Sequence, residues 1–282
     1  MGDLAFDTTV VGEGGRYRAE LSRDWEIWGP NGGYLAALAL RAAGAYTPLR
    51  RPATFTCHYL GVADFEHVDL LVEPMRESKR AASLRVSMRQ HDTPILEAMV
   101  WVVGELDGLR HDAAPMPAGV RPPEELPSVG ELLEPEDMVY HRFWSNFDER
   151  PLRWIPRSEW VDREPGEPRV QSWYRYVPTA TFTDPFVDAA RVLLLIDTLM
   201  WPAAVRAYRN DDLTFYAPSI DLSAQFHGLA PESEWLFCEA YSPMARDGLV
   251  GGSTAVWSQD GRLLGTGAQQ MMCRPGSLQP GT

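Results

Sequence analysis

The sequence contains few cysteines and almost no lysine. Cysteine occurs only at Cys57, Cys238 and Cys273, and this odd number and wide spacing fit neither a disulfide framework nor a CxxC metal clip. Lys79 is the single lysine among 26 basic residues. We interpret this imbalance as a compositional bias of the genome and not as a sign of function.

Membrane and export segments are also lacking. No apolar run reaches the roughly 18 residues of a membrane-spanning helix. The first residues, MGDLAFDTTVVGEGG, have neither a basic start nor a long apolar core, so they do not fit a signal peptide. These features predict a cytoplasmic protein without a membrane span.

The charge balance is acidic, with 39 acidic residues against 26 basic ones and a net charge of −13. Nucleic-acid binding needs a basic face, so a nucleic-acid partner is not expected. A small anionic ligand held by a few arginines remains compatible. Hydrophobic residues make up 45% of the 282, which is a globular composition sufficient for one large domain or two ordinary ones.

A proline-rich stretch divides the chain. Residues 111–135 contain six prolines and little apolar periodicity, which is typical of a linker. The following residues, 136–167, are aromatic-rich but irregular. We therefore expect an N-terminal unit at 1–112, a linking segment at 113–167 and a C-terminal unit at 168–282.

The two units follow one plan, a central helix and then a run of strands. In the first unit we expect a strand-like opening at 8–21, a helix at 31–46 and strands at 54–60, 83–89 and 95–103. In the second we expect a strand at 170–178, a helix at 186–207 and strands at 218–227, 235–242, 249–258 and 262–273. Asp184 fits an N-cap, and Pro202 should kink the helix or end it early.

Such a pattern favours an α+β fold in which each antiparallel sheet wraps its helix. Joining the two sheets edge to edge would hide their edge strands. The halves match at an offset of 167 or 168, and at 168 Trp101 takes the place of Gln269. The first half would then be a copy that kept the scaffold but lost this polar group.

Three polar residues in the second unit are candidates for chemistry. Asp197 lies in the apolar helical stretch VLLLIDTLMW, where a carboxylate is costly unless it is bonded or has a function. Ser219 alternates with Ile220 in PSIDLSAQFH, and this pattern by itself favours a solvated outer face over a line of hydroxyls facing a site. Gln269 interrupts an otherwise apolar last strand, and simple exposure is an open alternative.

The segment NGGY, at the start of the first helix, is a candidate substrate-binding element. Asn31 can cap the helix, and Gly32 and Gly33 leave bare N–H groups before Tyr34. Positive partial charge gathers at such a helix start, which suits a carbonyl oxygen or an anion. A simple tight turn before a helix is the alternative.

Several common catalytic motifs are missing from the sequence. GxSxG, HExxH, the Walker loop and the dinucleotide fingerprint do not occur, and the six histidines are scattered. We expect no metal and no cofactor. Neither predicted helix contains a histidine.

With these residues in place, the sequence resembles the type II (TesB-like) acyl-CoA thioesterases, which have a double hotdog fold. The segments that carry the resemblance are NGGYLAALALRAA, APSIDLSAQFHG and WSQDGRLLGTGAQQMMCRP. It implies two antiparallel sheets, each wrapping a central helix, joined into one continuous sheet. In that family an aspartate, a Thr or Ser and a glutamine hold a water against the thioester, and these positions fall on Asp197, Ser219 and Gln269.

The resemblance implies hydrolysis of an acyl-CoA to a free acid and CoA. Asp197 would deprotonate the water, Ser219 and Gln269 would hold it, and a backbone N–H near Gly32 or Gly33 would polarise the carbonyl. Arginines at the mouth would meet the CoA phosphates.

Two other functions remain open at this point: a non-catalytic acyl-binding protein on the same fold, and an enoyl-CoA hydratase, which the histidine-free helices disfavour. A homo-oligomer also remains possible. An Asp197 engaged in a salt bridge would favour the binding protein, whereas convergence of the three residues would favour hydrolysis.

Overall fold

The computed structural model describes residues 1–133, 141–156, 159 and 163–276. Within these residues no helix is both long and apolar enough to cross a membrane. The predicted linking segment is partly described, and its residues 134–140, 157–158 and 160–162 lie outside the described part.

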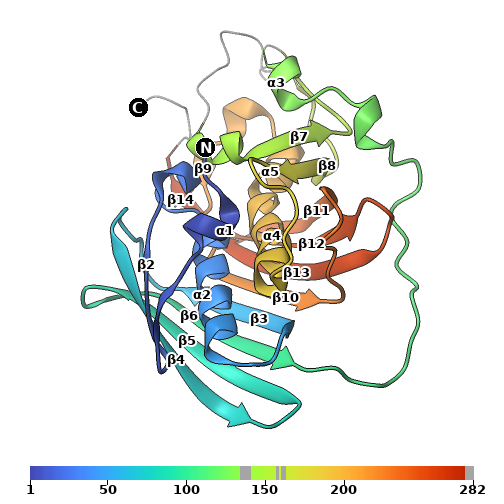
Figure 1. The fold of residues 1–282 in the computed structure, drawn as a ribbon. Helices are drawn as coiled ribbons and strands as arrows, with labels where there is room; N and C mark the ends of the chain where they lie inside the picture. Colours follow the sequence, from blue (N-terminus) through green and yellow to red (C-terminus); the bar gives the residue numbers. More distant parts are fainter. Residues whose placement is uncertain (134–140, 157–158, 160–162, 277–282) are drawn as a thin grey trace.

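A twelve-stranded antiparallel sheet forms the framework of the described chain (Figure 1). The strand order is β1-β2-β4-β5-β6-β3-β10-β13-β12-β11-β8-β7. The strands are β1 (Val11–Glu13), β2 (Arg16–Glu20), β3 (Arg51–Tyr59), β4 (His67–Glu77), β5 (Ala81–Gln90), β6 (Thr93–Val103), β7 (Phe147–Pro151), β8 (Arg169–Tyr176), β10 (Asp221–Phe226), β11 (Trp235–Arg246), β12 (Leu249–Ser258) and β13 (Leu263–Met272). Strands β9 (Phe215–Tyr216) and β14 (Arg274–Pro275) form a separate pair.

The two halves of the sheet join where β3 pairs with β10, with Ser223 opposite Thr56. Every strand upstream of this junction comes from the first half of the chain, and every strand beyond it from residues after 146. The predicted α+β double hotdog, with both sheets continuous, is therefore confirmed. Because β3 and β10 pair with each other, neither half presents a free edge there.

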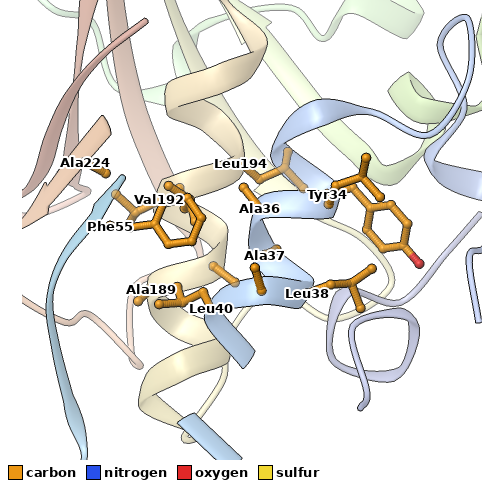
Figure 2. Close-up of a cluster of buried hydrophobic side chains, with 14 of the residues drawn as sticks. Tyr34, Ala36, Ala37, Leu38, Leu40, Phe55, Ala189, Val192, Leu194 and Ala224 are labelled. Carbon is orange, nitrogen blue, oxygen red and sulfur yellow. The ribbon is translucent and has the colours of Figure 1, made fainter. Parts of the chain in front are cut away.

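Helices α2 (Gly32–Tyr46) and α4 (Pro185–Thr198) are the central helices of the two halves and lie side by side (Figure 1). Asn31 caps α2 by accepting a hydrogen bond from the Tyr34 N–H, and Asp184 caps α4 in the same way for Phe186. Figure 2 shows small side chains between the helices, among them Ala36 of α2 and Ala189 of α4. These small residues allow the helices to approach closely.

Helix α4 ends before residue 207, which confirms the prediction that Pro202 would kink the helix or end it early. It stops at Thr198, and a short helix, α5 (Met200–Ala204), follows with Pro202 inside its first turn, where a missing N–H is tolerated. The break leaves Asp197 at the end of α4 and not in the middle of a longer helix. Short 3₁₀ turns follow at Val205–Ala207 and Asn210–Asp212.

The remaining elements are short and lie outside the sheet and the two central helices. They are α1 (Leu4–Asp7), α3 (Val129–Leu132) and the 3₁₀ turns Arg23–Trp25, Pro123–Glu125 and Arg142–Asn146. The segment predicted to be irregular also supplies β7, which pairs with β8 at the sheet edge. Its alternation was hidden because FDERP has only one strongly apolar residue, and that residue, Phe147, is buried.

The offset of 168 residues equated Trp101 with Gln269, but the two side chains lie on opposite faces of their strands. Trp101 is 38% exposed, whereas Gln269 is 4% exposed and faces the core. The inward residues beside Trp101 are Val100 and Val102, both fully buried. An error of one residue in register exchanges the two faces of a strand, so a valine and not the tryptophan corresponds to Gln269.

Candidate active site

Asp197 lies at the junction of the two central helices. Its Oδ2 accepts a hydrogen bond from the Gly33 N–H at 2.7 Å, across from α4 to the first turn of α2. Its Oδ1 accepts one from the Ser219 hydroxyl at 3.1 Å. The residue is 8% exposed, so the carboxylate is almost removed from water but keeps two hydrogen bonds.

Burial raises the pKa of Asp197 to about 6. The hydrogen bonds from Gly33 and Ser219, and then the neighbouring Tyr59 hydroxyl, act in the opposite direction by favouring the ionised form. The positive end of the α2 dipole also lies at Gly33, which favours a carboxylate there. A carboxylate with a pKa near neutrality is a better base than an exposed one and is still ionised at pH 7.

Ser219 faces the core and not the outer face, although its place in the alternation groups it with Ser223. Ser223 pairs with Ala268, so a regular ladder would pair Ser219 with Met272. Ser219 instead bridges Met271. This one-residue shift has the form of a β-bulge, which turns the side chain towards Asp197.

Gln269 completes the group from β13. Its Nε2 donates to the Asp197 backbone carbonyl at 3.0 Å, which directs Oε1 to within 3.2 Å of the Ser219 Oγ. The serine hydroxyl has one proton for two acceptors, Asp197 Oδ1 and Gln269 Oε1. When Asp197 is ionised, it accepts the hydrogen bond from the serine hydroxyl. Gln269 Oε1 is then free to accept a hydrogen bond from a water.

The start of α2 contributes backbone N–H groups, more than side chains, to the site around Asp197. Asn31 is a cap, and the Gly33 N–H is engaged by Asp197. The Gly32 N–H, at the first helical position, has no acceptor among the described residues. The Tyr34 ring stacks on Trp25 at 5.5 Å, away from α4 (Figure 2), and its hydroxyl donates to the Asp7 carbonyl. The Tyr34 side chain therefore anchors the N-terminal segment.

Tyr59 is the residue at this site that the sequence did not single out. It ends β3, and its buried hydroxyl oxygen lies close to Gly32 and Asp197. The signal was present in TFTCHYL, where Phe55, Cys57 and Tyr59 share the inner face of the strand. A tyrosine at the end of an inner face places a hydroxyl inside the fold.

The three candidate residues thus converge through direct contacts, from α4, the start of β10 and β13. Asp197 forms no ion pair with any described residue, and no histidine takes part in the contacts. A buried carboxylate of raised pKa beside a hydroxyl and an amide can hold and deprotonate a water. Fold and site together define a double-hotdog protein suited to hydrolysis by an activated water.

The chain belongs to the acyl-CoA thioesterase family. Residues 21–103 match the acyl-CoA thioesterase N-terminal domain, and residues 118–273 match the acyl-CoA thioesterase C-terminal domain. The resemblance to the TesB-like enzymes is confirmed, and the protein is an acyl-CoA thioesterase that hydrolyses acyl-CoA. Neither the acyl-binding protein nor the hydratase is favoured.

Solved structures share the whole architecture. An acyl-CoA thioesterase II, TesB2, of Mycobacterium marinum is 22% identical, with a TM-score of 0.77 over 98% of this chain and 99% of its own. A TesB protein of Mycobacterium avium subsp. paratuberculosis is 24% identical, with a TM-score of 0.76 over 97% and 99%. A hot dog protein of unknown function from Alicyclobacillus acidocaldarius is 18% identical, with a TM-score of 0.79 over 98% and 100%. A comparison with curated protein sequences found no match.

Proposed function

We propose that Asp197, Ser219 and Gln269 form the catalytic group of this thioesterase. Ionised Asp197 takes a proton from a water that Ser219 and Gln269 hold in place. The single observation that carries this proposal is that the serine hydroxyl lies within hydrogen-bond distance of both Asp197 Oδ1 and Gln269 Oε1. A water bound beside the serine can donate to the same two acceptors.

We propose that the Gly32 N–H is the backbone donor to the thioester carbonyl. The Gly33 N–H already donates to Asp197, so Gly32 is the bare donor of NGGY nearest the carboxylate. A Cβ at Gly32 would lie 3.1 Å from Asp197 Oδ2, so any side chain there would crowd the base. Asn31 supports this element as its cap, and Tyr34 contributes its backbone.

Release of free thiol from an acyl-CoA panel of increasing chain length tests the catalytic group. Asp197→Asn keeps the shape and is expected to lower kcat by at least about 1,000-fold, because the base is lost. Ser219→Ala and Gln269→Ala are expected to lower it less, by about 10- to 100-fold, because each removes a positioning contact.

Ser223→Ala is the matched control, since its hydroxyl faces outwards and bonds to the Ala268 carbonyl. It should retain wild-type turnover. Turnover at the wild-type rate in Asp197→Asn would remove Asp197 as the base.

We also propose the division into an N-terminal hotdog at 1–112, a linking segment at 113–167 and a C-terminal hotdog at 168–282 that carries the catalytic group. The separate family matches at 21–103 and 118–273 support two units. The buried free cysteines Cys57 and Cys238 support a cytoplasmic location. Met99 and Trp101, exposed on the outer sheet face, support a homo-oligomer, which light scattering of the purified protein would reveal.

A further inference from the structure

The buried Tyr59 hydroxyl makes no hydrogen bond of good geometry to any described residue, and its polar neighbours are the Asp197 carboxyl and the Cys57 thiol. Buried polar atoms are nearly always paired, so an exception at a reactive site needs an explanation. Three of the other four unpaired atoms are arginine Nε atoms, and those guanidinium groups bond through other nitrogens. Tyr59 has no second polar atom on its side chain to compensate.

The backbone fixes Tyr59 against the catalytic group. Its N–H donates to the Ile220 carbonyl at 3.0 Å, directly beside Ser219, at the junction of the two sheets. Cys57, two residues earlier, is buried on the same face. The tyrosine ring is thus held from the first half of the chain against a site built mainly by the second half.

The hydroxyl and the base both lie against the first turn of α2. A Cβ on Gly32 would lie 3.1 Å from the Tyr59 hydroxyl oxygen and 3.1 Å from Asp197 Oδ2, so a side chain there would crowd both groups. The Gly32 N–H in the same turn has no acceptor among the described residues. A carbonyl oxygen that accepts from the Gly32 N–H is therefore a candidate acceptor for the phenol as well.

The phenol is a donor at all working pH values. Burial, and then the charge of Asp197, raise the pKa of Tyr59 well above its usual value. The group therefore keeps its proton and is neutral. Such a donor, fixed in a buried site, stabilises negative charge that develops on a nearby oxygen.

We propose that the Tyr59 hydroxyl donates a hydrogen bond to the carbonyl oxygen of the bound thioester and is a fourth catalytic residue. This rests on the function proposed above. The water oxygen bonds to the carbonyl carbon, its proton passes to Asp197, and the carbonyl electron pair moves to the oxygen held by Tyr59 and Gly32. That pair then returns, the C–S bond breaks, and the leaving sulfur takes the proton from Asp197.

A spectroscopic test reads this hydrogen bond without turnover. The probe is an acyl-CoA analogue in which a methylene replaces the thioester sulfur, with a ¹³C-labelled carbonyl. A donated hydrogen bond lowers the infrared stretching frequency of the carbonyl. We expect a lower frequency in the wild-type complex than in Tyr59→Phe, and equal frequencies would overturn the proposal.

Kinetics provide the second readout. Tyr59→Phe is expected to lower kcat about 100-fold with little change in KM, as for loss of one oxyanion donor. An unchanged kcat, or a change confined to the pH profile, would overturn the proposal, because the hydroxyl would then act on Asp197 alone. Tyr46→Phe, a hydroxyl at the other end of α2, is the control and should match the wild type.

The two readouts separate the two proposals. If Asp197→Asn retains activity, the assignment of the base fails. The carbonyl frequency still decides whether Tyr59 contacts the substrate.

Discussion

At the scale of single residues, the site depends on one buried carboxylate whose pKa is raised to about 6. Two hydrogen bonds keep Asp197 ionisable, and burial makes it basic. Its sequence context, a carboxylate in an apolar helix, predicted a residue with a hydrogen-bonded or functional role. Only the contacts with Gly33 and Ser219 explain why that group is tolerated there.

The raised pKa predicts how activity depends on pH. Protonated Asp197 cannot act as a base, so kcat/KM should fall about tenfold per pH unit below about pH 6 and level off above it. Initial rates measured from pH 4.5 to 8.5 with one acyl-CoA give the dependence of kcat/KM on pH and show whether it falls in this way. A flat profile across this range would show that a group other than Asp197 takes the proton.

The same shift predicts a gain in stability on removing the charge. The pKa of Asp197 is raised from 3.8 to about 6 on folding, so the folded state binds the proton more tightly. The stabilisation is complete below pH 3.8 and is lost as pH rises through about 6. Ionisation at pH 8 therefore costs on the order of 3 kcal/mol.

Asp197→Asn is thus expected to unfold at higher urea concentration than the wild type at pH 8, with the difference vanishing near pH 4. The matched control is Asp69→Asn. The hydrogen bond from Arg18 lowers the pKa of Asp69, so that substitution should not stabilise at pH 8. A less stable Asp197→Asn at pH 8 would contradict the assigned cause.

At the scale of elements, the contact between α2 and α4 positions the base. Gly33 lies at a close approach of the two helices: a Cβ there would be 2.9 Å from the Leu194 Cα and 3.0 Å from the Leu194 carbonyl oxygen. Both are backbone atoms, which cannot rotate away. The glycine pair of NGGY therefore permits close helix packing at Gly33 and close approach of Asp197 and Tyr59 at Gly32.

Gly33→Ala should separate the two helices. Overpacking costs about 1–3 kcal/mol, and the shift moves the Gly33 N–H away from Asp197. We expect lower stability in urea together with reduced kcat. Gly104→Ala is the control, because its nearest neighbour would be the Leu49 Cδ2 at an ordinary 3.5 Å. Wild-type stability in Gly33→Ala would show that α2 and α4 can accommodate a methyl group at Gly33, which would contradict tight packing there.

At the scale of the whole molecule, the two hotdogs share one sheet and one core. The main buried cluster contains Leu40 and Phe55 of the first half with Leu194 and Ala224 of the second. Strands β3 and β10 pair across the junction. Separating the halves would expose these apolar side chains and the backbone of both strands to water.

We therefore expect the two halves to unfold as one unit. Native-state hydrogen exchange should give the same opening free energy for the protected amides of β3 and β10 and for the inner strands of each half. Thermal unfolding should show one calorimetric transition. Two well-separated transitions, or a large gap in opening free energy between β5 and β12, would contradict a shared core.

The sequence alone determined the duplicated plan, the two central helices and most of the strands, the two N-caps and the early end of α4 near Pro202, but it missed β4 and β7. The features that it determined follow from local periodicity and capping, which act over a few residues. The motifs also indicated the family and the candidate residues Asp197, Ser219 and Gln269.

The tertiary structure decided which side chains face one another. Alternation grouped Ser219 with the outer face and the offset equated Trp101 with Gln269, because a period of two carries no information about a bulge or a one-residue register shift. Tyr59 and Gly33 reach Asp197 from more than 130 residues away in the chain. Contacts between distant segments depend on how the helices and sheets pack, so no local pattern reveals them.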